Sequence, residues 1–306
     1  MRYYFAPMEG LTDSVYRRLH HKYFPGVDRY FMPFFSPTVH WTFTSRETRE
    51  LPKADSVPFC AVPQMLTNDP ENFLWAAEAC RDLGYAEINL NAGCPSGTVV
   101  AKRKGSGMLR DLDSLSDFFD RIFAKSPLPV SVKTRLGMEE PEEFEKVLAL
   151  YNRYPIRELI VHPRVRRQFY EGQVQVEWFR YAAEHTAIPL CYNGDIRSLS
   201  DATALKAQFP GLEAVMVGRG LIADPGMLAG GTEIGTLEAF LNALMDDYTE
   251  EFSGCRNALF RMKENWAYLH NRFAGSDKLW KQMRKTTDAA QFRALSAQVL
   301  HTCPLV

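Results

Sequence analysis

Up to about residue 230, short runs of β-branched and aromatic residues alternate with longer stretches whose apolar residues recur at helical spacing. This alternation is typical of parallel strands joined by helices. There are eight strand-like runs, the number of strands in a closed (β/α)8 barrel. They cover residues 3–6, 30–32, 57–62, 86–90, 128–132, 158–161, 188–192 and 214–217.

The helical stretches between these runs cover residues 12–23, 69–83, 113–124, 141–151, 174–184 and 198–209. Thr12, Asp69 and Ser198 stand at the start of three of them and are of types that cap helix N-termini. A doubly wound open sheet would produce the same alternation. The strand count favours the barrel, so we expect an α/β protein with a (β/α)8 TIM barrel.

The pattern changes past residue 230, where the strand-like runs stop. Apolar residues recur every four positions over 240–252, and Gly254 and Gly275 are expected breaks between helices. We therefore expect a catalytic barrel domain over 1–232, followed by a small all-helical domain over 233–306.

Composition narrows the class of protein. With 306 residues, 46% of them hydrophobic, the chain can bury a large core. No apolar run approaches the 18 residues of a membrane span, and the start does not resemble a secretory signal. The six cysteines have neither zinc-knuckle nor redox-pair spacing. These features predict a cytoplasmic protein with reduced thiols, no metal site and no membrane partner, which we expect to be a monomer.

Charge is unevenly distributed along the chain. The formal net charge of −1 alone argues against a nucleic-acid partner. Residues 252–294, however, contain nine Lys or Arg against three Asp or Glu, a local net of +6. Within this segment Lys263, Lys281 and Arg284 are candidate phosphate contacts, and Lys102 to Lys104 form a second basic cluster. A solvated helix face is the alternative interpretation of the basic segment.

Nearly every predicted strand ends in residues able to perform chemistry or bind phosphate. In a barrel these ends converge on one face. The residues concerned are Pro7, Met8, Gln64, Asn91, Cys94, Lys133, Arg135, His162, Arg164, Asn193, Gly194, Asp195, Gly218, Arg219 and Gly220.

Three features of these strand ends indicate a binding site. Cys94 lies between Gly93 and Pro95, which favours an exposed loop over the buried position common for a lone cysteine. Lys133 needs an anionic partner, because burial of an unpaired ammonium is unfavourable. Glycine-rich turns after the seventh and eighth runs are typical of phosphate binding in barrels. Gly105-Ser106-Gly107 follows no strand, so we assign it no dinucleotide-binding role.

Six motifs in order resemble the tRNA-dihydrouridine synthases over almost the whole chain. They are Ala6-Pro7-Met8, Asn91-Ala92-Gly93-Cys94-Pro95, Val132 to Gly137, His162 to Gly172 with Arg164, Gln168 and Tyr170, Asn193-Gly194-Asp195, and Gly218-Arg219-Gly220. The sequence departs from the family pattern at Asn89, where Asp is usual, at Pro163, where Gly is commoner, and at Met138, where Trp is common. These departures leave the subgroup, and hence the target uridine, open.

The resemblance implies an FMN-bound barrel that uses NADPH to reduce the 5,6 double bond of uridine in tRNA. Hydride would pass from flavin N5 to C6, and Cys94 would give a proton to C5. The implied roles fall into three groups. Pro7, Met8 and Gln64 would line the isoalloxazine ring, with Lys133 and His162 hydrogen-bonding it; Asn193, Gly194, Asp195, Gly218 and Arg219 would hold the phosphate; Asn91, Arg135, Arg164, Lys263, Lys281 and Arg284 would face the substrate.

Uracil chemistry is consistent with these roles. Its 5,6 double bond is conjugated to a carbonyl, so hydride addition at C6 builds charge that an acid must neutralise at C5. Three alternatives stay open: an FMN barrel acting on a free small molecule, a flavin-free sugar-phosphate barrel that uses Lys133, and an RNA-binding protein that has lost catalysis.

Overall fold

The computed structural model describes residues 1–38 and 40–306, and its central feature is a sheet of nine parallel strands. The strands are β1 (Arg2–Phe5), β2 (Arg29–Phe31), β3 (Ala61–Val62), β4 (Gln64–Met65), β5 (Ile88–Ala92), β6 (Val130–Arg135), β7 (Leu159–His162), β8 (Leu190–Tyr192) and β9 (Ala214–Val217). Their order is β3-β2-β1-β9-β8-β7-β6-β5-β4.

The two end strands of this order, β3 and β4, are separated by Pro63 alone. Pro63 has no N–H to give to a ladder, but its carbonyl accepts from the Asn89 N–H at 2.9 Å. On the other side, Val62 pairs with Phe31 of β2. Residues 61–65 thus act as one interrupted strand, and the sheet forms a nearly closed barrel. The predicted (β/α)8 fold class is confirmed.

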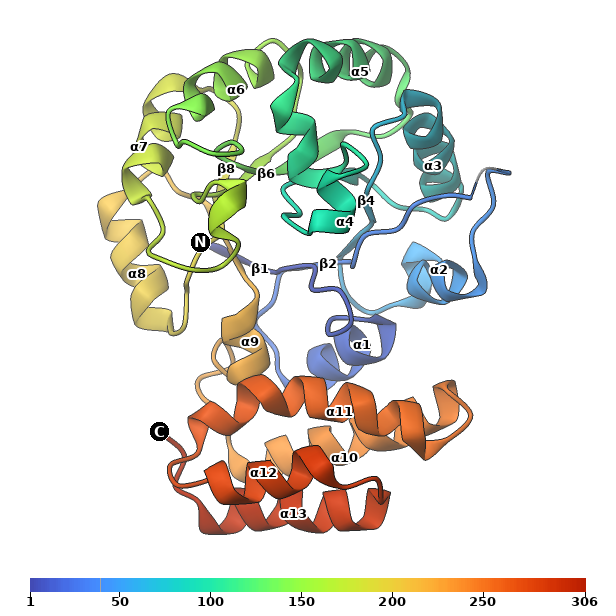
Figure 1. Ribbon diagram of the computed structural model, residues 1–306, viewed down its shortest axis with the longest axis vertical. Helices are drawn as coiled ribbons and strands as arrows, with labels where there is room; N and C mark the ends of the chain where they lie inside the picture. The colour runs from blue at the N-terminus through green and yellow to red at the C-terminus, as the bar shows by residue number, and fades with distance from the viewer. Residues whose placement is uncertain (39) are drawn as a thin grey trace. The chain divides into compact units, whose positions relative to one another are not determined.

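Helices alternate with these strands, as the apolar spacing predicts. In the barrel, α3 (Pro70–Asp82), α5 (Leu112–Lys125), α6 (Glu143–Tyr151) and α7 (Val176–His185) lie around the sheet (Figure 1). The shorter α2 (Ser45–Glu50) and α4 (Gly97–Val100) were not predicted. After β8 comes α8 (Leu199–Gln208).

Two of the predicted helix caps are confirmed and one is wrong. Asp69 accepts from the Glu71 and Asn72 N–H groups at the start of α3, and Ser198 Oγ accepts from the Asp201 N–H. Helix α1 (Ser14–Tyr23) is capped by Asp13, one residue later than predicted. Thr12 is not the cap because its hydroxyl accepts from the Met8 N–H at 2.8 Å.

The barrel interior has an apolar and a polar part. One apolar cluster joins inward residues of β1, β2, β3, β7, β8 and β9: Tyr4, Phe31, Val62, Ile160, Cys191, Ala214 and Met216, with Ala6 beyond β1. Strands β4, β5 and β6 contribute buried polar side chains instead, namely Gln64, Asn89 and Ser131. Buried polar groups need hydrogen-bond partners, and these three bond to one another.

Contacts divide the chain into two compact units. One contains Met1–Pro7, Asp28–Asp195 and Thr203–Met216; the other contains Met8–Val27, Ile196–Ala202 and Val217–Val306. The second unit thus includes α1 as well as the C-terminal helices, so the units do not follow a single cut in the chain. A separate domain over 233–306 stays a prediction.

The second unit consists of helices. They are α1, α9 (Arg219–Ala223), α10 (Ile234–Glu251), α11 (Cys255–Leu269), α12 (Asp277–Lys285) and α13 (Ala289–Thr302) (Figure 1). Gly254 and Gly275 lie at breaks between helices, as predicted, with φ of +157° and +76°. Phe240 of α10 contacts the rings of Tyr16 and Phe24. In the described ranges 1–38 and 40–306, none of the helices combines the length and apolarity needed to cross a membrane.

Candidate functional site

Cys94 lies on the loop that follows β5, at the carboxyl edge of the sheet. Its backbone N–H and that of Gly93 donate to Asn91 Oδ1 at 2.8 and 3.1 Å. A Cβ on Gly93 would come 3.3 Å from the Lys133 carbonyl, so glycine lets this loop pack closely on β6. The Cys94 residue is partly exposed, as the flanking glycine and proline predict.

A second segment holds the Cys94 loop from the other side. The backbone N–H and the hydroxyl of Ser106 both donate to the Cys94 carbonyl, at 3.1 and 2.9 Å. Gly105 has φ of +57°, and a Cβ there would lie 2.8 Å from the same carbonyl. Sequence reasoning gave residues 105–107 no role at the site. The only available signal was the pair of glycines, which does not identify what they pack against.

Lys133 projects from β6, near the carboxyl edge of the sheet. Within residues 1–38 and 40–306, its ammonium has no hydrogen bond or ion pair, although the residue is largely covered. Burial, and then the positive charge of Arg135, lower the pKa of Lys133 to about 8, while the Cys191 and Cys94 thiols act in the opposite direction. A largely covered, unpaired ammonium fits an anionic ligand group, as the sequence predicts.

Arg135 joins the loops that follow β5 and β7. Its Nε donates to the Gly93 carbonyl at 2.9 Å and its Nη1 to the Val165 carbonyl at 3.1 Å. The guanidinium lies over the Tyr170 ring, 5.3 Å from its centroid, and the residue is only 1% exposed. The prediction that Arg135 contacts the substrate is not supported by this position, because the side chain is buried and binds backbone carbonyls.

The Arg164 guanidinium also binds other groups of the protein. Its Nη1 and Nη2 bind the two carboxylate oxygens of Asp195 at 3.2 and 2.5 Å. Nη1 also contacts His162 Nε2 at 3.0 Å, Nη2 donates to the Gly172 carbonyl, and Nε donates to the Glu171 carbonyl. All five N–H groups therefore have partners, and the residue is 1% exposed. This geometry does not support the predicted substrate contact.

The same contacts fix the tautomer of His162. Arginine can only donate hydrogen bonds, so the Nε2 atom of His162 must be an acceptor when it contacts Arg164. The proton of the neutral ring is then on Nδ1. Nδ1 is thus the donor nitrogen of the neutral ring, and the predicted hydrogen bond of His162 to a flavin stays a prediction.

Tyr170 is the exposed member of this group. Its ring stacks on His162 at 6.0 Å between centroids and 27° between planes, and the residue is 55% exposed. The neighbouring Phe169 has φ of +50°, outside the usual range for its residue type. Tyr170 belongs to a recognised motif, but the sequence analysis gave it no role of its own. Its position beside His162 and Arg135 makes it a site residue.

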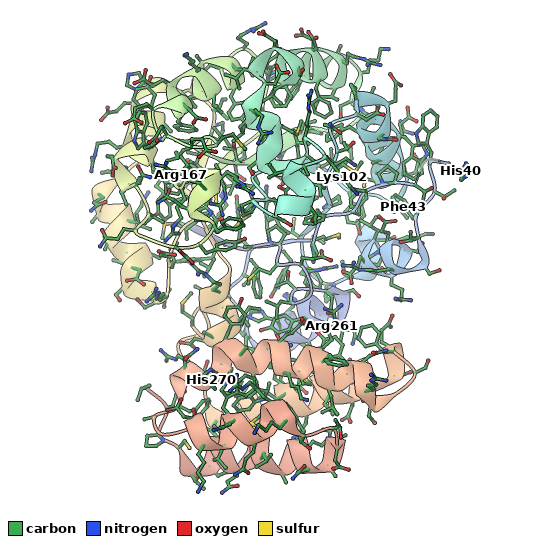
Figure 2. All side chains as sticks on the ribbon, in the orientation of Figure 1. His40, Phe43, Lys102, Arg167, Arg261 and His270 are labelled. Carbon is green, nitrogen blue, oxygen red and sulfur yellow. The ribbon has the colours of Figure 1, made fainter. Side chains whose placement is uncertain are left out.

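Replacing Arg164 by Met is expected to lower the free energy of unfolding by about 3 kcal/mol, because it leaves Asp195 and two loop carbonyls without their partner. Denaturant unfolding of the variant measures this. Arg167→Met is the matched control: Arg167, labelled in Figure 2, lies in the same segment, is 53% exposed and pairs with exposed Glu140. It should lose less than about 1 kcal/mol. Equal losses in both variants would contradict the assigned role of Arg164.

The predicted phosphate-binding residues lie at or directly after strand ends. Asn193 Nδ2 donates to the Met216 carbonyl at 2.8 Å, and Asp195 is bound to Arg164. A Cβ on Gly194 would come 2.9 Å from Val174 Cγ1, so close packing requires glycine there. Gly218 and Arg219 follow β9 at the start of α9. Their phosphate contacts stay a prediction.

Pro7, Met8 and Gln64 were predicted to line a flavin ring. Pro7 and Met8 follow β1 and are partly exposed. Gln64 is fully buried, with its amide bound to Asn89 and Asn91 at 2.8 Å each. A side chain without exposed surface cannot touch a ligand in this conformation, so a direct cofactor contact by Gln64 is not supported.

The basic residues of the helical unit fall into two groups. Lys263 donates to the Thr286 carbonyl at 2.6 Å, and Arg261 donates to the Gly10 carbonyl, so both stabilise their own unit. A substrate contact by Lys263 is therefore not supported. Lys281 and Arg284 are exposed on α12, which buries Trp280 and Met283, and the Arg284 guanidinium lies over the Trp280 ring, 5.6 Å from its centroid.

The geometry can be compared with known proteins. Residues 4–302 match the family described as dihydrouridine synthase (Dus). A probable tRNA-dihydrouridine synthase of Rickettsia bellii is 30% identical over 226 residues, covering 73% of this chain and 68% of that protein. The tRNA-dihydrouridine(16) synthase of Neisseria meningitidis serogroup B is 27% identical over 312 residues, covering 96% and 93%.

A solved structure of morphinone reductase shares the fold, with a TM-score of 0.53 at 12% identity, covering 76% of this chain and 86% of that one. The family match spans nearly the whole chain and includes the Cys94 loop, Lys133 and the His162 to Gly172 segment. This protein is an oxidoreductase that belongs to the dihydrouridine synthase family.

Proposed function

We propose that this protein is a tRNA-dihydrouridine synthase that uses FMN and NADPH to reduce the 5,6 double bond of a uridine in tRNA. The observation that carries the proposal is the pairing of a partly exposed thiol with an unpaired ammonium on adjacent strand ends, Cys94 after β5 and Lys133 on β6. The names of the relatives from R. bellii and N. meningitidis support tRNA as the substrate.

The residues present fit a flavin mononucleotide. Within residues 1–38 and 40–306, Lys133 has no ion pair, and the neutral His162 ring carries its proton on Nδ1. Lys133 would stabilise negative charge on the ring system, and His162 would hold the ring by a hydrogen bond. Asn193, Gly194 and Asp195 after β8, and Gly218 and Arg219 at the start of α9, are the candidate phosphate contacts. When bound and reduced, FMN supplies the hydride that adds at C6 of uracil.

Cys94 would be the proton donor. Hydride addition at C6 leaves negative charge that is delocalised between C5 and O4, and a protonated thiol can give its proton to C5. Asn91 Oδ1 accepts from the Cys94 N–H, and the Ser106 hydroxyl donates to the Cys94 carbonyl. The thiol is thus carried on a loop fixed at both sides, which favours transfer to one atom of an extruded base.

Exposed cations would bind the tRNA backbone. Lys281 and Arg284 lie on α12, with Lys278 and Lys285 on the same helix. In the barrel unit, Lys102 follows α4 (Figure 2), and its carbonyl accepts from Asn68. Asn68 adjoins α3, where Asn72 binds the indole N–H of Trp41, a residue that is 49% exposed. Exposed cations and exposed aromatic rings are both typical of surfaces that bind RNA.

Replacing Lys281 and Arg284 together by Gln is expected to weaken tRNA binding and to flatten its salt dependence. Each lost phosphate contact should reduce the slope of log K against log salt by about 0.7 to 0.9, hence by about 1.5 for the pair. Filter binding over a range of salt concentrations measures this slope. Lys125→Gln with Lys146→Gln is the control, because both lysines are exposed on barrel helices and should leave the slope unchanged. An unchanged slope in the first variant would remove the assignment.

The proposed activity is tested with purified protein, FMN, NADPH and unmodified tRNA transcripts. Dihydrouridine should form in the tRNA and NADPH should be consumed in equal amounts. Reduction of free pyrimidines or enones, with none of tRNA, would favour a small-molecule reductase instead. Protein that takes up no FMN would favour the flavin-free barrel.

A further inference from the structure

A file of buried polar side chains runs through the barrel from β5 at its carboxyl edge to the opposite edge. We call Asn91, Gln64, Asn89, Ser131 and Glu87 the polar file. Asn91 Nδ2 donates to Gln64 Oε1, and Gln64 Nε2 donates to Asn89 Oδ1, both at 2.8 Å. Asn89 Nδ2 donates to Ser131 Oγ at 2.8 Å, and Ser131 Oγ donates to Glu87 Oε1 at 2.9 Å. None of the five is more than 7% exposed.

Strand register places these groups in contact. Gln64 of β4 is directly opposite Asn89 of β5, and Asn89 is directly opposite Ser131 of β6. Glu87 and Asn91 precede and follow Asn89 by two residues, so their side chains project to the same side of the strand. The polar file therefore depends on local pairing rather than on long flexible loops.

The two ends of the polar file are different. At one end, Asn91 Oδ1 accepts from the Gly93 and Cys94 N–H groups. At the other end, Glu87 Oε2 accepts from Arg29 Nη1 at 3.0 Å and forms an ion pair with Arg157 Nε at 2.9 Å. The file thus joins the loop of the proposed proton donor to a carboxylate held by two arginines.

The carboxylate at one end of the polar file and the two loop N–H donors at the other end both require the observed direction of its bonds. Glu87 can only accept, so Ser131 must donate to it and is left with its lone pairs for Asn89 Nδ2. Asn89 then presents Oδ1 to Gln64, and Gln64 presents Oε1 to Asn91. Asn91 consequently directs its Oδ1, and not its NH2 group, to the two loop N–H groups.

We propose that Glu87 is a positioning residue for the reaction, which acts through Ser131, Asn89 and Gln64 to orient the Asn91 amide that holds the Cys94 loop. Its catalytic consequence rests on the proposed function. The orientation of the Cys94 loop does not depend on the proposed function, and it can be measured without substrate.

Glu87→Gln tests this directly. A glutamine can offer its NH2 group to Ser131, which allows every amide in the file to reverse and to present Asn91 NH2 to the Gly93 and Cys94 N–H groups. Amide hydrogen exchange at residues 93 and 94 in the FMN-bound protein should accelerate about tenfold. Turnover on tRNA should fall about tenfold or more in kcat, with the KM for NADPH unchanged. Unchanged exchange would overturn the proposal, and faster exchange with unchanged kcat would overturn its catalytic part.

A charge-relocation variant separates orientation from general stability. In Glu87→Gln with Asn89→Asp, the carboxylate moves to residue 89, where it accepts from Gln64 Nε2 and restores the direction of the bonds to Asn91. The amide exchange rates at residues 93 and 94 should fall toward their wild-type values. The kcat on tRNA should rise toward its wild-type value. Failure of both to return would contradict the proposed direction of the file.

Glu158→Gln is the matched control. Glu158 is a second buried carboxylate of the same barrel end, 3.8 Å from Arg29, but it accepts from Tyr4, and in the part of the chain that the structure describes it has no bond to the polar file. It should leave exchange at residues 93 and 94 unchanged; acceleration equal to that of Glu87→Gln would overturn the proposal.

If Glu87→Gln does not fold, Ser131→Ala is the second variant, because it breaks the polar file while keeping the Glu87 ion pairs. The same acceleration of exchange is expected, and unchanged exchange would overturn the proposal.

Discussion

Cys94→Ala is expected to lower turnover on tRNA by about 10²- to 10⁴-fold, the range for loss of a general acid. FMN binding and reduction by NADPH should be retained, because neither step needs the proton that Cys94 is proposed to donate. Stopped-flow absorbance measures the flavin steps, and dihydrouridine formation in single turnover measures the transfer to tRNA.

Cys60→Ala is the control for this variant. Cys60 is also an exposed thiol, but it directly precedes β3 and therefore lies at the amino edge of the sheet. The control should keep wild-type turnover. Full activity of Cys94→Ala would show that another group, or water, supplies the proton.

Lys133→Met is expected to lower turnover by about 10²- to 10³-fold, a magnitude typical of losing one preorganised group that stabilises developing charge. The substitution keeps most of the side-chain volume and removes the charge. The reduced flavin should also be less stable relative to the oxidised form, so a lower reduction potential is expected. Unchanged turnover and potential would contradict the assigned role of Lys133.

The same variant should make the flavin-free protein more stable, by about 1 kcal/mol at pH 7, because it removes a largely covered and unpaired ammonium. The folded pKa of Lys133, about 8, lies below the unfolded value of about 10.4. Between these values the unfolded state binds more protons, so wild-type stability should rise with pH. The difference in free energy of unfolding between Lys133→Met and the wild type should disappear near pH 10. Denaturant unfolding at pH 7 and pH 10 measures both effects.

The alternation of strand-like and helical runs predicts most of the fold. Each of the eight runs overlaps an observed strand. The run over 214–217 matches its strand at both ends, and the other runs have ends displaced by up to four residues, because hydrophobicity does not mark where a ladder begins. The run over 57–62 includes β3 but misses β4, since Pro63 interrupts the pairing. The compact units could not be predicted, because α1 precedes most of the barrel in the chain and yet packs with the C-terminal helices.

The candidate site shows a clear limit of sequence reasoning. Strand ends and motifs identify Cys94, Lys133 and His162 as candidate site residues. They do not distinguish these from Arg135 and Arg164, whose guanidinium groups bind loop carbonyls and Asp195. Whether an arginine at a strand end faces a ligand depends on loop conformation, which residue spacing does not determine.

The sequence analysis also did not identify the residues that hold the Cys94 loop in place. Ser106 and Gly105 lie more than ten residues from Cys94, and Glu87 acts from the opposite end of the barrel. Their residue types are common on any surface. Only the direction of each hydrogen bond in three dimensions identifies them.

The central claim, reduction of a tRNA uridine with Cys94 as acid, is tested most directly by mass spectrometry of tRNA from a strain that lacks this protein. We predict that dihydrouridine disappears from a specific position and returns when the wild-type gene is restored, but not when Cys94→Ala is supplied. Unchanged dihydrouridine in the deletion strain, or full restoration by Cys94→Ala, would contradict the account.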